Sequence, residues 1–324
     1  MIRFINVKIL SLRNIICLIM SEPNTIILAV ACNNHYVIML AALLKSIEIN
    51  HTSGELIEVW IIDDNISRRN KARLEASVDC KMIKLLWIRN KEAIPHDMKL
   101  PLDRNTYPLN IFMRIFIPYF IPANRPKVLY MDVDMIVTFD ISKLWQTDVS
   151  NYVLAAVTDS SAVYIKNNIK NYKELGLPGD SKYFNSGLLL MNVSRWRDED
   201  VTRKVIHSVN DNRKFTEFSD QYGLNVNLVG KWLELDPLWN YYADGTHLAP
   251  YNIHFFHRKP FYKSYFNNKA YQELFYKYLN QTEWRNSKPV GEIKRYIIKA
   301  RNVLEKLPLY LKQRPPARKL ALKR

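Results

Sequence analysis

Two carboxylates stand one residue apart in a run that is otherwise apolar. Asp132 and Asp134 lie within residues 128–137, whose other members are Val, Leu, Tyr, Met and Ile. Such a run is typical of a buried strand. Alternate strand residues point to one face, so we expect both carboxylates on the same side, roughly 6–7 Å apart. Because buried charges are usually paired or bound to metal, the pattern predicts a divalent-cation site. The alternative is that Asp134 caps the strand at a turn and Asp132 meets an ordinary partner.

The elements before this run predict the scaffold that positions it. Apolar runs rich in β-formers at 25–32, 57–62 and 82–88 alternate with helical patterns at 36–49 and after Ser67, a suitable N-cap. This β-α-β-α-β order predicts an α/β fold with a mainly parallel, Rossmann-like sheet flanked by helices. Further helices are expected at 109–119, 141–145, 198–212 and 220–229, and strands at 152–157, 183–193, 232–235 and 252–256. The polar stretch at 160–182 is expected to form a surface excursion or lid.

Glycine placement gives a further indication of a ligand. Gly187 lies inside the expected strand at 183–193, and Gly within a strand often marks close approach of a ligand to the backbone. The chain has no Gly-x-Gly-x-x-Gly after the first strand and no P-loop. Dinucleotide or triphosphate binding of those two kinds is therefore excluded.

The positive charge is concentrated at the C-terminus. Net charge is +16, and residues 288–324 hold twelve Lys/Arg against two Glu, which leaves +6 for the preceding 287 residues. Apolar residues interleave with these cations, from Tyr296 to Leu311. A basic amphipathic segment of this kind is expected to lie on an anionic membrane surface. A solvated helix packed on the domain is the alternative. Nucleic-acid binding is not expected, because no recognition motif accompanies the charge.

The N-terminal residues and the cysteines indicate the cellular compartment in which the protein is expected. Charged residues interrupt the apolar stretch at 1–19 and no small-residue cleavage site follows, so a secretory signal is not expected. We expect the structured protein to begin near Met20. Three widely spaced cysteines argue against a disulfide framework and for a reducing, cytoplasmic compartment.

An ordered series of motifs resembles glycosyltransferase family 8, the retaining, metal-dependent sugar transferases with a GT-A fold. The series is CNNHY at 32–36, Arg114, YMDVD at 130–134, LWQTD at 144–148, Asp159, FNSGLLLMN at 184–192 with RW at 195–196, SDQYGLN at 219–225, and a His before Lys-Pro-aromatic. The resemblance implies a GT-A catalytic domain at 21–265, between a poorly defined extension at 1–20 and a basic, helical, amphipathic segment at 266–324.

The resemblance also implies a role for each matching residue. Asp132, Asp134 and His254 are similar to the ligands of Mn²⁺ or Mg²⁺, and mixed carboxylate and imidazole ligation suits manganese. Gln221, Asp220 and Asp159 fall on catalytic positions, with the neutral amide of Gln221 beneath the anomeric carbon. The remaining nucleotide-sugar contacts implied are Asn33, His35, Tyr36, Arg114, Val133, Asn185 and Lys259, with both aspartates of the metal site among them. Lys259 would stabilise the diphosphate and Tyr36 would stack on the base.

The chain departs from the family pattern at two places. Asn33 stands where the family usually has an Asp that reads uracil, although an amide retains a donor and an acceptor. His254 and Lys259 are five residues apart rather than six, without the usual Gly between them, and Phe261 replaces a Trp. His257 lies in the same shortened loop and is the alternative third metal ligand.

Two other functions compete with a UDP-hexose transferase. A haloacid-dehalogenase-like phosphatase also opens on a strand followed by Asp-x-Asp, but its strand lies near the chain start, whereas about a hundred residues of α/β pattern come first here. The second competitor is a non-enzymatic basic protein that binds a membrane surface. The resemblance favours a cytoplasmic enzyme, or one peripheral to the inner face of the plasma membrane, that transfers a hexose to a saccharide or lipid-linked glycan in lipopolysaccharide-like biosynthesis.

Overall fold

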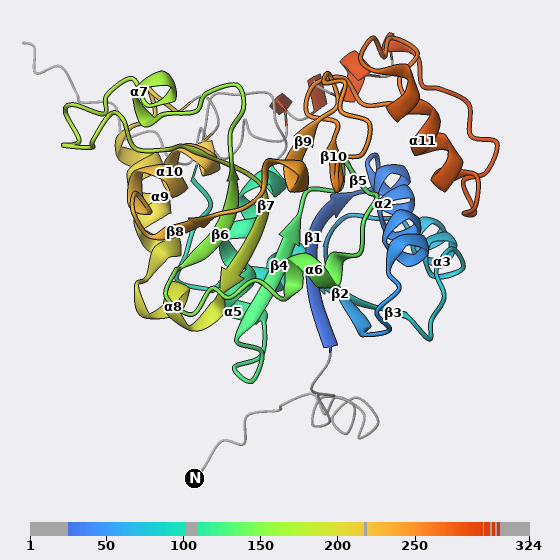
Figure 1. Cartoon of the computed structure of the whole chain (residues 1–324), viewed down its shortest axis with the longest axis horizontal. Coiled ribbons are helices and arrows are strands. Elements are labelled where there is room, and N and C mark those ends of the chain that lie inside the picture. Colours follow the sequence, from blue (N-terminus) through green and yellow to red (C-terminus); the bar gives the residue numbers. More distant parts are fainter. Residues whose placement is uncertain are drawn as a thin grey trace, which may run out of the picture.

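A computed structural model describes residues 25–101, 109–216 and 219–304, with Lys294, Lys299 and Asn302 excepted. The predicted extension at 1–20 and the last twenty residues lie outside this range. A seven-stranded sheet runs through the middle of the molecule, with helices on both sides (Figure 1). Its strands, in spatial order, are β3 (Ile83–Arg89), β2 (Leu56–Asp64), β1 (Thr25–Asn33), β4 (Lys127–Met131), β7 (Phe184–Asn192), β6 (Leu154–Thr158) and β8 (Trp232–Glu234). A separate three-stranded sheet contains β5 (Met135–Val137), β10 (Asn252–His254) and β9 (Tyr241–Tyr242).

The sheet is mixed, as predicted. β3, β2, β1 and β4 pair with one another in parallel, β7 is antiparallel to both β4 and β6, and β8 is parallel to β6. The α/β prediction with a mainly parallel sheet is therefore confirmed. The first half owes its parallel pairing to the alternation of apolar runs with helical patterns, because each parallel crossover needs a helix to return the chain.

Alternation along β1 divides the core between the two faces of the sheet. Ile26, Leu28 and Val30 pack on one face against α2 (Val37–Asn50), while Ile27 and Ala29 pack on the other. All five side chains are buried, as a strand covered on both faces requires.

Helices of the two layers come from different parts of the chain. The first face is covered by α2, α3 (Arg68–Glu75), α6 (Ile141–Trp145) and α11 (Lys269–Leu279). The second is covered by α4 (Asn90–Ala93), η1 (Leu109–Phe116), α5 (Ile117–Phe120), α8 (Val193–Asp198), α9 (Val201–Asp211) and α10 (Ser219–Asn227). Ser67 caps α3 as predicted, since its side chain accepts from the Asn70 backbone N–H at 3.3 Å. In the described part of the chain no helix is both long enough and apolar enough to cross a membrane.

The prediction of one continuous strand over residues 128–137 is wrong. β4 ends at Met131, and β5 begins at Met135 in the other sheet, antiparallel to β10. Asp132, Val133 and Asp134 form the turn between them. The chain leaves the main sheet after Met131, so both partly exposed carboxylates lie beyond the end of β4. The two aspartates thus face one cavity from a turn rather than from the same side of a strand.

Two expected helices also differ in detail. The segment at 109–119 is a 3-10 helix, η1, that continues into α5. The helix expected at 198–212 is α9, which begins only at Val201; Asp198 instead ends α8, and Asp200, with φ 48° in the left-handed region, separates the two helices. The polar excursion at 160–182 carries a short helix, α7 (Ile165–Asn168), which is labelled at the upper left of Figure 1.

The chain beyond residue 265 begins with a helix that belongs to the core. In α11, Tyr271, Phe275, Tyr278 and Leu279 are buried in the same cluster as α2. The described residues of 292–304 are helical as well. The division of the chain at residues 20 and 265 remains a prediction.

Candidate active site

One cavity opens where the main sheet meets the three-stranded sheet. Its lining comes from the ends of β1, β4 and β7, from η1 and the first turn of α10, and from the segment after β10. The lining residues are Ala31, Tyr36, Asn110, Ile111, Arg114, Tyr130, Asp132, Val133, Asp134, Asn185, Ser186, Gly187, Asp220, Gln221, His254, Phe256 and Lys259. Ligands of open α/β sheets commonly bind outside the carboxyl ends of strands, and the chain brings its candidate residues to that edge.

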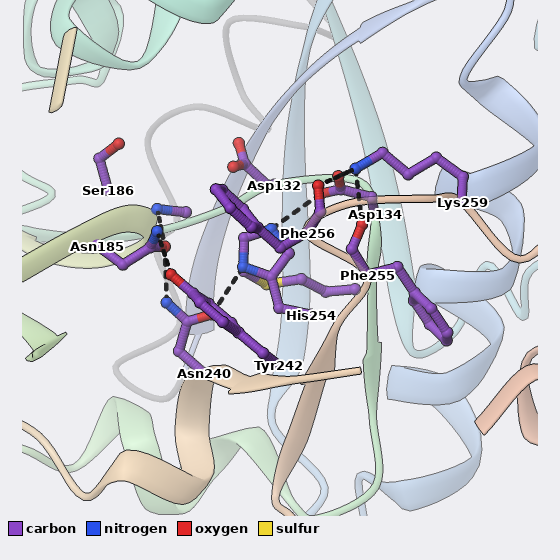
Figure 2. Close-up of polar contacts among 12 residues, drawn as sticks. Asp132, Asp134, Asn185, Ser186, Asn240, Tyr242, His254, Phe255, Phe256 and Lys259 are labelled. Carbon is purple, nitrogen blue, oxygen red and sulfur yellow. Dashed lines mark hydrogen bonds and ion pairs between the residues drawn. The ribbon is translucent and has the colours of Figure 1, made fainter. Parts of the chain in front are cut away.

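Three potential metal ligands meet at this junction. Asp132, Asp134 and His254 each offer one ligand atom, and these atoms all lie within 4.8 Å of one another. Asp132 and Asp134 flank the turn after β4, and His254 ends β10, which pairs with β5 so that His254 lies opposite Met135. Both sheets therefore contribute to the group, which Figure 2 shows in close-up.

Gly187 leaves the space between these ligands open. The backbone N–H of Asp132 donates to the Gly187 carbonyl at 2.7 Å, which holds the turn against β7. A Cβ on Gly187 would lie 2.7 Å from His254 Cε1 and 3.0 Å from Asp132 Oδ2. Only glycine fits here without displacing one of these two side chains. The close approach predicted at Gly187 is thus made by the candidate metal ligands Asp132 and His254. We call this open space beside Gly187, bounded by Asp132 and His254, the cradle. The cradle and a donor set of two carboxylates and one imidazole fit a divalent cation such as Mn²⁺.

Arg114 holds two of the carboxylates. Its guanidinium lies 3.0 Å from Asp132 Oδ1 and 3.0 Å from Asp220 Oδ2, and it also donates to the Ser186 carbonyl at 2.5 Å. Burial alone would lower the pKa of Arg114, but Asp132 and Asp220 outweigh burial and raise that pKa above its ordinary value. Arg114 is therefore a buried, permanently charged side chain whose planar guanidinium contacts both carboxylates and the Ser186 carbonyl. It does not extend to the surface.

Lys259 holds the third carboxylate. Its Nζ lies 2.5 Å from Asp134 Oδ2 and donates to the carbonyls of Phe255 and Phe256 at 2.6 and 3.0 Å (Figure 2). Burial would raise the pKa of Asp134, but the ammonium of Lys259 outweighs burial and holds that pKa well below its usual range. For Asp132 burial prevails over the opposing effect of Arg114 and raises the pKa.

The formal charges favour a divalent cation with an anionic ligand. Counted without His254, the three carboxylates of Asp132, Asp134 and Asp220 and the two cations Arg114 and Lys259 give the cavity a formal charge of −1. A divalent cation reverses that sign, and an anionic diphosphate could then be accommodated in a mostly buried site. Without a cation, the carboxylates depend on Arg114 and Lys259 for compensation.

A network of amides forms the floor of the cavity. Gln221 Oε1 accepts from the Ser186 backbone N–H at 3.0 Å, and Gln221 Nε2 donates to Asp159 Oδ2 at 3.0 Å. Asn185 Nδ2 also donates to Asp159, at 3.3 Å. Asp159 itself is buried and lies behind these two amides, outside the cavity lining. It therefore orients Asn185 and Gln221, and direct contact with a sugar remains a prediction.

The loop after β1 is ordered by its own asparagine. Asn33 Oδ1 accepts from the backbone N–H groups of His35 and Tyr36, each at 3.0 Å. His35 Nε2 lies 2.7 Å from the Tyr262 hydroxyl. Tyr36 lines the cavity, whereas Asn33 and His35 are not among the residues that line it. A role for Asn33 and His35 in binding the base remains a prediction, and their visible contacts shape the loop that presents Tyr36.

The structure brings most of the predicted residues to one place. Those lining the cavity are Tyr36, Arg114, Asp132, Val133, Asp134, Asn185, Asp220, Gln221, His254 and Lys259. Of the two candidate histidines, His254 is 2% exposed and lies beside both aspartates, whereas His257 is exposed and lies outside the lining.

Several residues that shape the site were given no role in the sequence analysis. Tyr130 donates to Asp132 at 2.5 Å, and Asn240 contacts His254 at 2.9 Å. Tyr242 stacks on Phe256 with ring centroids 5.0 Å apart. Tyr130 stands beside the Asp pair in the sequence and could have been found there. Asn240 and Tyr242 carry only the weak signal of a buried amide among aromatic residues.

Comparison with known proteins decides the class. The family model described as glycosyl transferase family 8 matches residues 27–274. The chain belongs to glycosyltransferase family 8. It is 31% identical over 224 residues to general stress protein A of Bacillus subtilis, covering 65% of this chain and 72% of that protein. It is 27% identical over 280 residues to glycosyltransferase GlyB of Streptococcus pneumoniae, covering 81% of this chain and 63% of that protein.

A solved structure supports the fold. The galactosyltransferase LgtC, crystallised with donor and acceptor sugar analogues, superposes with a TM-score of 0.66 at 23% identity, over 80% of this chain and 99% of that one. The predicted GT-A fold and the prediction of a glycosyltransferase are thus confirmed. The family assignment decides against both the phosphatase and the non-enzymatic binding protein.

Proposed function

We propose that this family 8 enzyme transfers a hexose from a UDP-sugar to a saccharide or lipid-linked glycan, with retention of anomeric configuration and with Mn²⁺ or Mg²⁺ bound. The observation that carries the proposal is the group formed by Asp132, Asp134 and His254 within one cavity, beside the cations Arg114 and Lys259. A divalent cation together with a lysine is the arrangement expected for a diphosphate leaving group.

Contacts between the lining side chains support a donor lying across the cavity. Tyr36 lies edge to face with Phe261, two residues after Lys259, and its ring is where the base would stack. Lys259 contacts Asp134, and the diphosphate would lie at these two residues and the metal ligands. Arg114 joins Asp132 to Asp220, and Ser186 contacts both Asp220 and Gln221, where hydroxyl groups of the sugar would find acceptors and donors. Galactose and glucose are the donor sugars we favour.

In this mechanism the protein forms no covalent bond with the donor and acts by binding and by electrostatic stabilisation. Asp132, Asp134 and His254 would hold the cation, which supplies Lewis-acid stabilisation of charge on the departing diphosphate. Lys259 adds a positive point charge to the same group. Gln221 is fixed by Ser186 and Asp159, so its neutral amide stays beneath the anomeric centre and stabilises positive charge there. This supports front-face transfer with retention, because a neutral amide is a weaker nucleophile than a carboxylate.

A UDP-sugar panel tests this proposal. UDP release and thermal shift would be measured with UDP-galactose, UDP-glucose and other UDP-hexoses, with Mn²⁺ against EDTA. We expect metal-dependent stabilisation by UDP and metal-dependent UDP release from at least one hexose donor. No response to any UDP-sugar in the presence of Mn²⁺ would overturn the proposal.

The C-terminal helix supports attachment to an anionic membrane, where a lipid-linked acceptor would lie. Within 292–304, Ile293, Ile297 and Leu304 are 80%, 62% and 65% exposed. Their spacing of four and seven residues places them on one face. A helix packed on its own domain would turn such a stripe inward. Here the inward contacts are polar: Glu292 lies 3.4 Å from Arg258 and accepts from Ser264. Attachment would locate the enzyme at the cytoplasmic face of the plasma membrane, in glycan biosynthesis of the lipopolysaccharide type.

Surface substitutions test attachment without disturbing the domain. Ile293→Ser, Ile297→Ser and Leu304→Ser together keep Glu292 and its contacts with the loop at 258–264. We expect the unmodified chain to bind vesicles containing anionic lipid in low salt and to release them in high salt. The triple variant should bind less, and Ile49→Ser, at another exposed apolar residue, should bind as the unmodified chain does. Equal binding by the triple variant would refute attachment through this helix.

A further inference from the structure

A chain of amides runs from the floor of the cavity to the back of His254. Its members are the Gly187 backbone N–H, Asn185 and Asn240. Figure 2 shows Asn240 between Asn185 of β7 and His254 of β10, so the chain joins the two sheets. Asn240 ends the short helix η2 (Pro237–Asn240) and is 5% exposed. It does not line the cavity, so a direct contact with donor is not its role.

The orientation of Asn185 is fixed at both ends. Its Oδ1 accepts from the Gly187 backbone N–H at 2.9 Å, and a backbone amide can only donate. Its Nδ2 faces the Asp159 carboxylate at 3.3 Å and the Tyr242 hydroxyl at 3.0 Å. Exchanging oxygen and nitrogen of this amide would set donor against donor at Gly187 and acceptor against carboxylate at Asp159. The identity of each atom therefore follows from groups that cannot change role.

The orientation of Asn240 follows from that of Asn185. Asn185 presents an oxygen to Asn240 at 2.8 Å, so Asn240 must present its Nδ2 there. Its Oδ1 then lies 2.9 Å from His254 Nδ1. An amide oxygen only accepts, so Nδ1 of the imidazole must carry the hydrogen. In the neutral ring Nε2 is then an acceptor, and it lies 3.4 Å from Asp134 Oδ1 within the metal-ligand group.

We propose that Asn240 is a positioning residue, which holds His254 in the Nδ1–H tautomer so that the Nε2 lone pair faces the cation site before any metal arrives. The inference rests on the metal site of the proposed function and deepens it. With the opposite tautomer, the Nε2 hydrogen would point at Asp134 and the ring would have to exchange its proton before it could bind a metal. Metal-binding histidines commonly depend on such a partner, and removing it typically weakens metal affinity about 10- to 100-fold.

The tautomer itself can be measured without metal, donor or turnover. Nitrogen-15 NMR of histidine-labelled, metal-free protein distinguishes the protonated from the unprotonated ring nitrogen, and His254→Gln identifies which of the seven histidine signals belongs to this ring. We expect His254 to carry its hydrogen on Nδ1. A hydrogen on Nε2 with none on Nδ1 in the unmodified protein would overturn the inference. This result stands apart from the proposed function, because a chain that binds no UDP-sugar would still report its tautomer.

Variants of Asn240 then link tautomer to affinity. In Asn240→Leu the acceptor is lost, and we expect Mn²⁺ affinity, measured by electron paramagnetic resonance, to fall about 10- to 100-fold and the Nδ1–H signal to weaken. Asn240→Asp keeps an acceptor for Nδ1 and should retain both the tautomer and most of the affinity, even though it loses the donation to Asn185.

A buried amide elsewhere serves as the control. Asn171 is 3% exposed and binds the Tyr222 hydroxyl at 3.0 Å, outside the cavity lining. Asn171→Leu should lose stability without change in Mn²⁺ affinity or in the His254 tautomer. The inference is wrong if Asn240→Leu folds and keeps both the tautomer and the Mn²⁺ affinity of the unmodified chain.

Discussion

Gly187 and His254 lie so close that a single methyl group would bring them into collision: a Cβ on Gly187 would stand 2.7 Å from Cε1 of the imidazole. The same glycine accepts from the backbone of Asp132 and donates to the side chain of Asn185. One residue of β7 thus sets the distance between a ligand from each sheet, and its lack of a side chain is what allows the three ligand atoms to approach.

Gly187→Ala should therefore damage the metal site more than the fold. Overpacking a fitted site typically costs about 1–3 kcal/mol. Here most of that strain falls on Asp132 and His254, so Mn²⁺ affinity should drop by roughly 5- to 150-fold. Calorimetric titration with Mn²⁺ measures the drop, and thermal unfolding in EDTA separates it from loss of stability. A Cβ on Gly291 meets nothing within 4 Å, so Gly291→Ala is the matched control. Unchanged Mn²⁺ affinity in Gly187→Ala would contradict the cradle.

Removing the positive charge of Arg114 should destabilise the whole domain. Arg114→Met leaves the buried Asp220 and the partly exposed Asp132 without their common partner, and breaking a buried pair from one side costs about 3–5 kcal/mol. Urea unfolding in EDTA would measure this loss. Arg114→Lys should recover only part of it, because one ammonium cannot match a planar fork that spans both carboxylates.

The control for Arg114 lies at the other end of the sheet. Arg125 pairs with buried Glu58 at 3.0 Å, but Lys84 lies 3.6 Å from the same carboxylate. Arg125→Met should consequently cost less than Arg114→Met and leave UDP affinity unchanged. If Arg114→Met were as stable as the unmodified chain, the assignment of Arg114 as compensating charge would be wrong.

Asp140 should make stability depend on pH in the acid range. Burial would raise the pKa of Asp140, but hydrogen bonds from the backbone of Ser142 and Thr52, and from His51, outweigh it and hold the pKa well below its ordinary value of 3.8. A depressed folded-state pKa means that the ionised group stabilises the fold above pH 3.8, and that this contribution disappears as the pH falls below it. Asp140→Asn should cost about 1–3 kcal/mol near neutral pH.

Asp140 is tested by the difference in free energy of unfolding between the unmodified chain and Asp140→Asn. Urea unfolding measured at several pH values should give a stability gap that is constant at neutral pH and narrows below about pH 4. A gap that stays constant down to pH 2, or that widens as the pH falls, would exclude the ionised Asp140 as its source.

The parallel strands β1, β2 and β3 could be predicted from the sequence because local patterns alone encode them. The apolar runs that become β1, β2 and β3 and the Ser67 N-cap need no knowledge of distant residues. The turn at Asp132–Val133–Asp134 could not be predicted from the run around it, because Met135–Val137 is as apolar as β4 and its departure depends on pairing with β10, more than a hundred residues later. His254 was chosen over His257 from a motif, and burial beside the aspartates supports that choice. Asn240 lay beyond sequence reasoning, since its role exists only through Asn185 and His254.

The most direct test of the account is the affinity for UDP with and without a divalent cation. Calorimetric titration would compare Mn²⁺ with EDTA in the unmodified chain and in Asp134→Asn, which removes one ligand and leaves Lys259 with the carbonyls of Phe255 and Phe256. We predict that EDTA weakens UDP binding at least about tenfold in the unmodified chain, and that Asp134→Asn binds UDP equally weakly in both conditions. Equal UDP affinity of the unmodified chain in Mn²⁺ and in EDTA would contradict the claim that Asp132, Asp134 and His254 bind a cation to the nucleotide diphosphate.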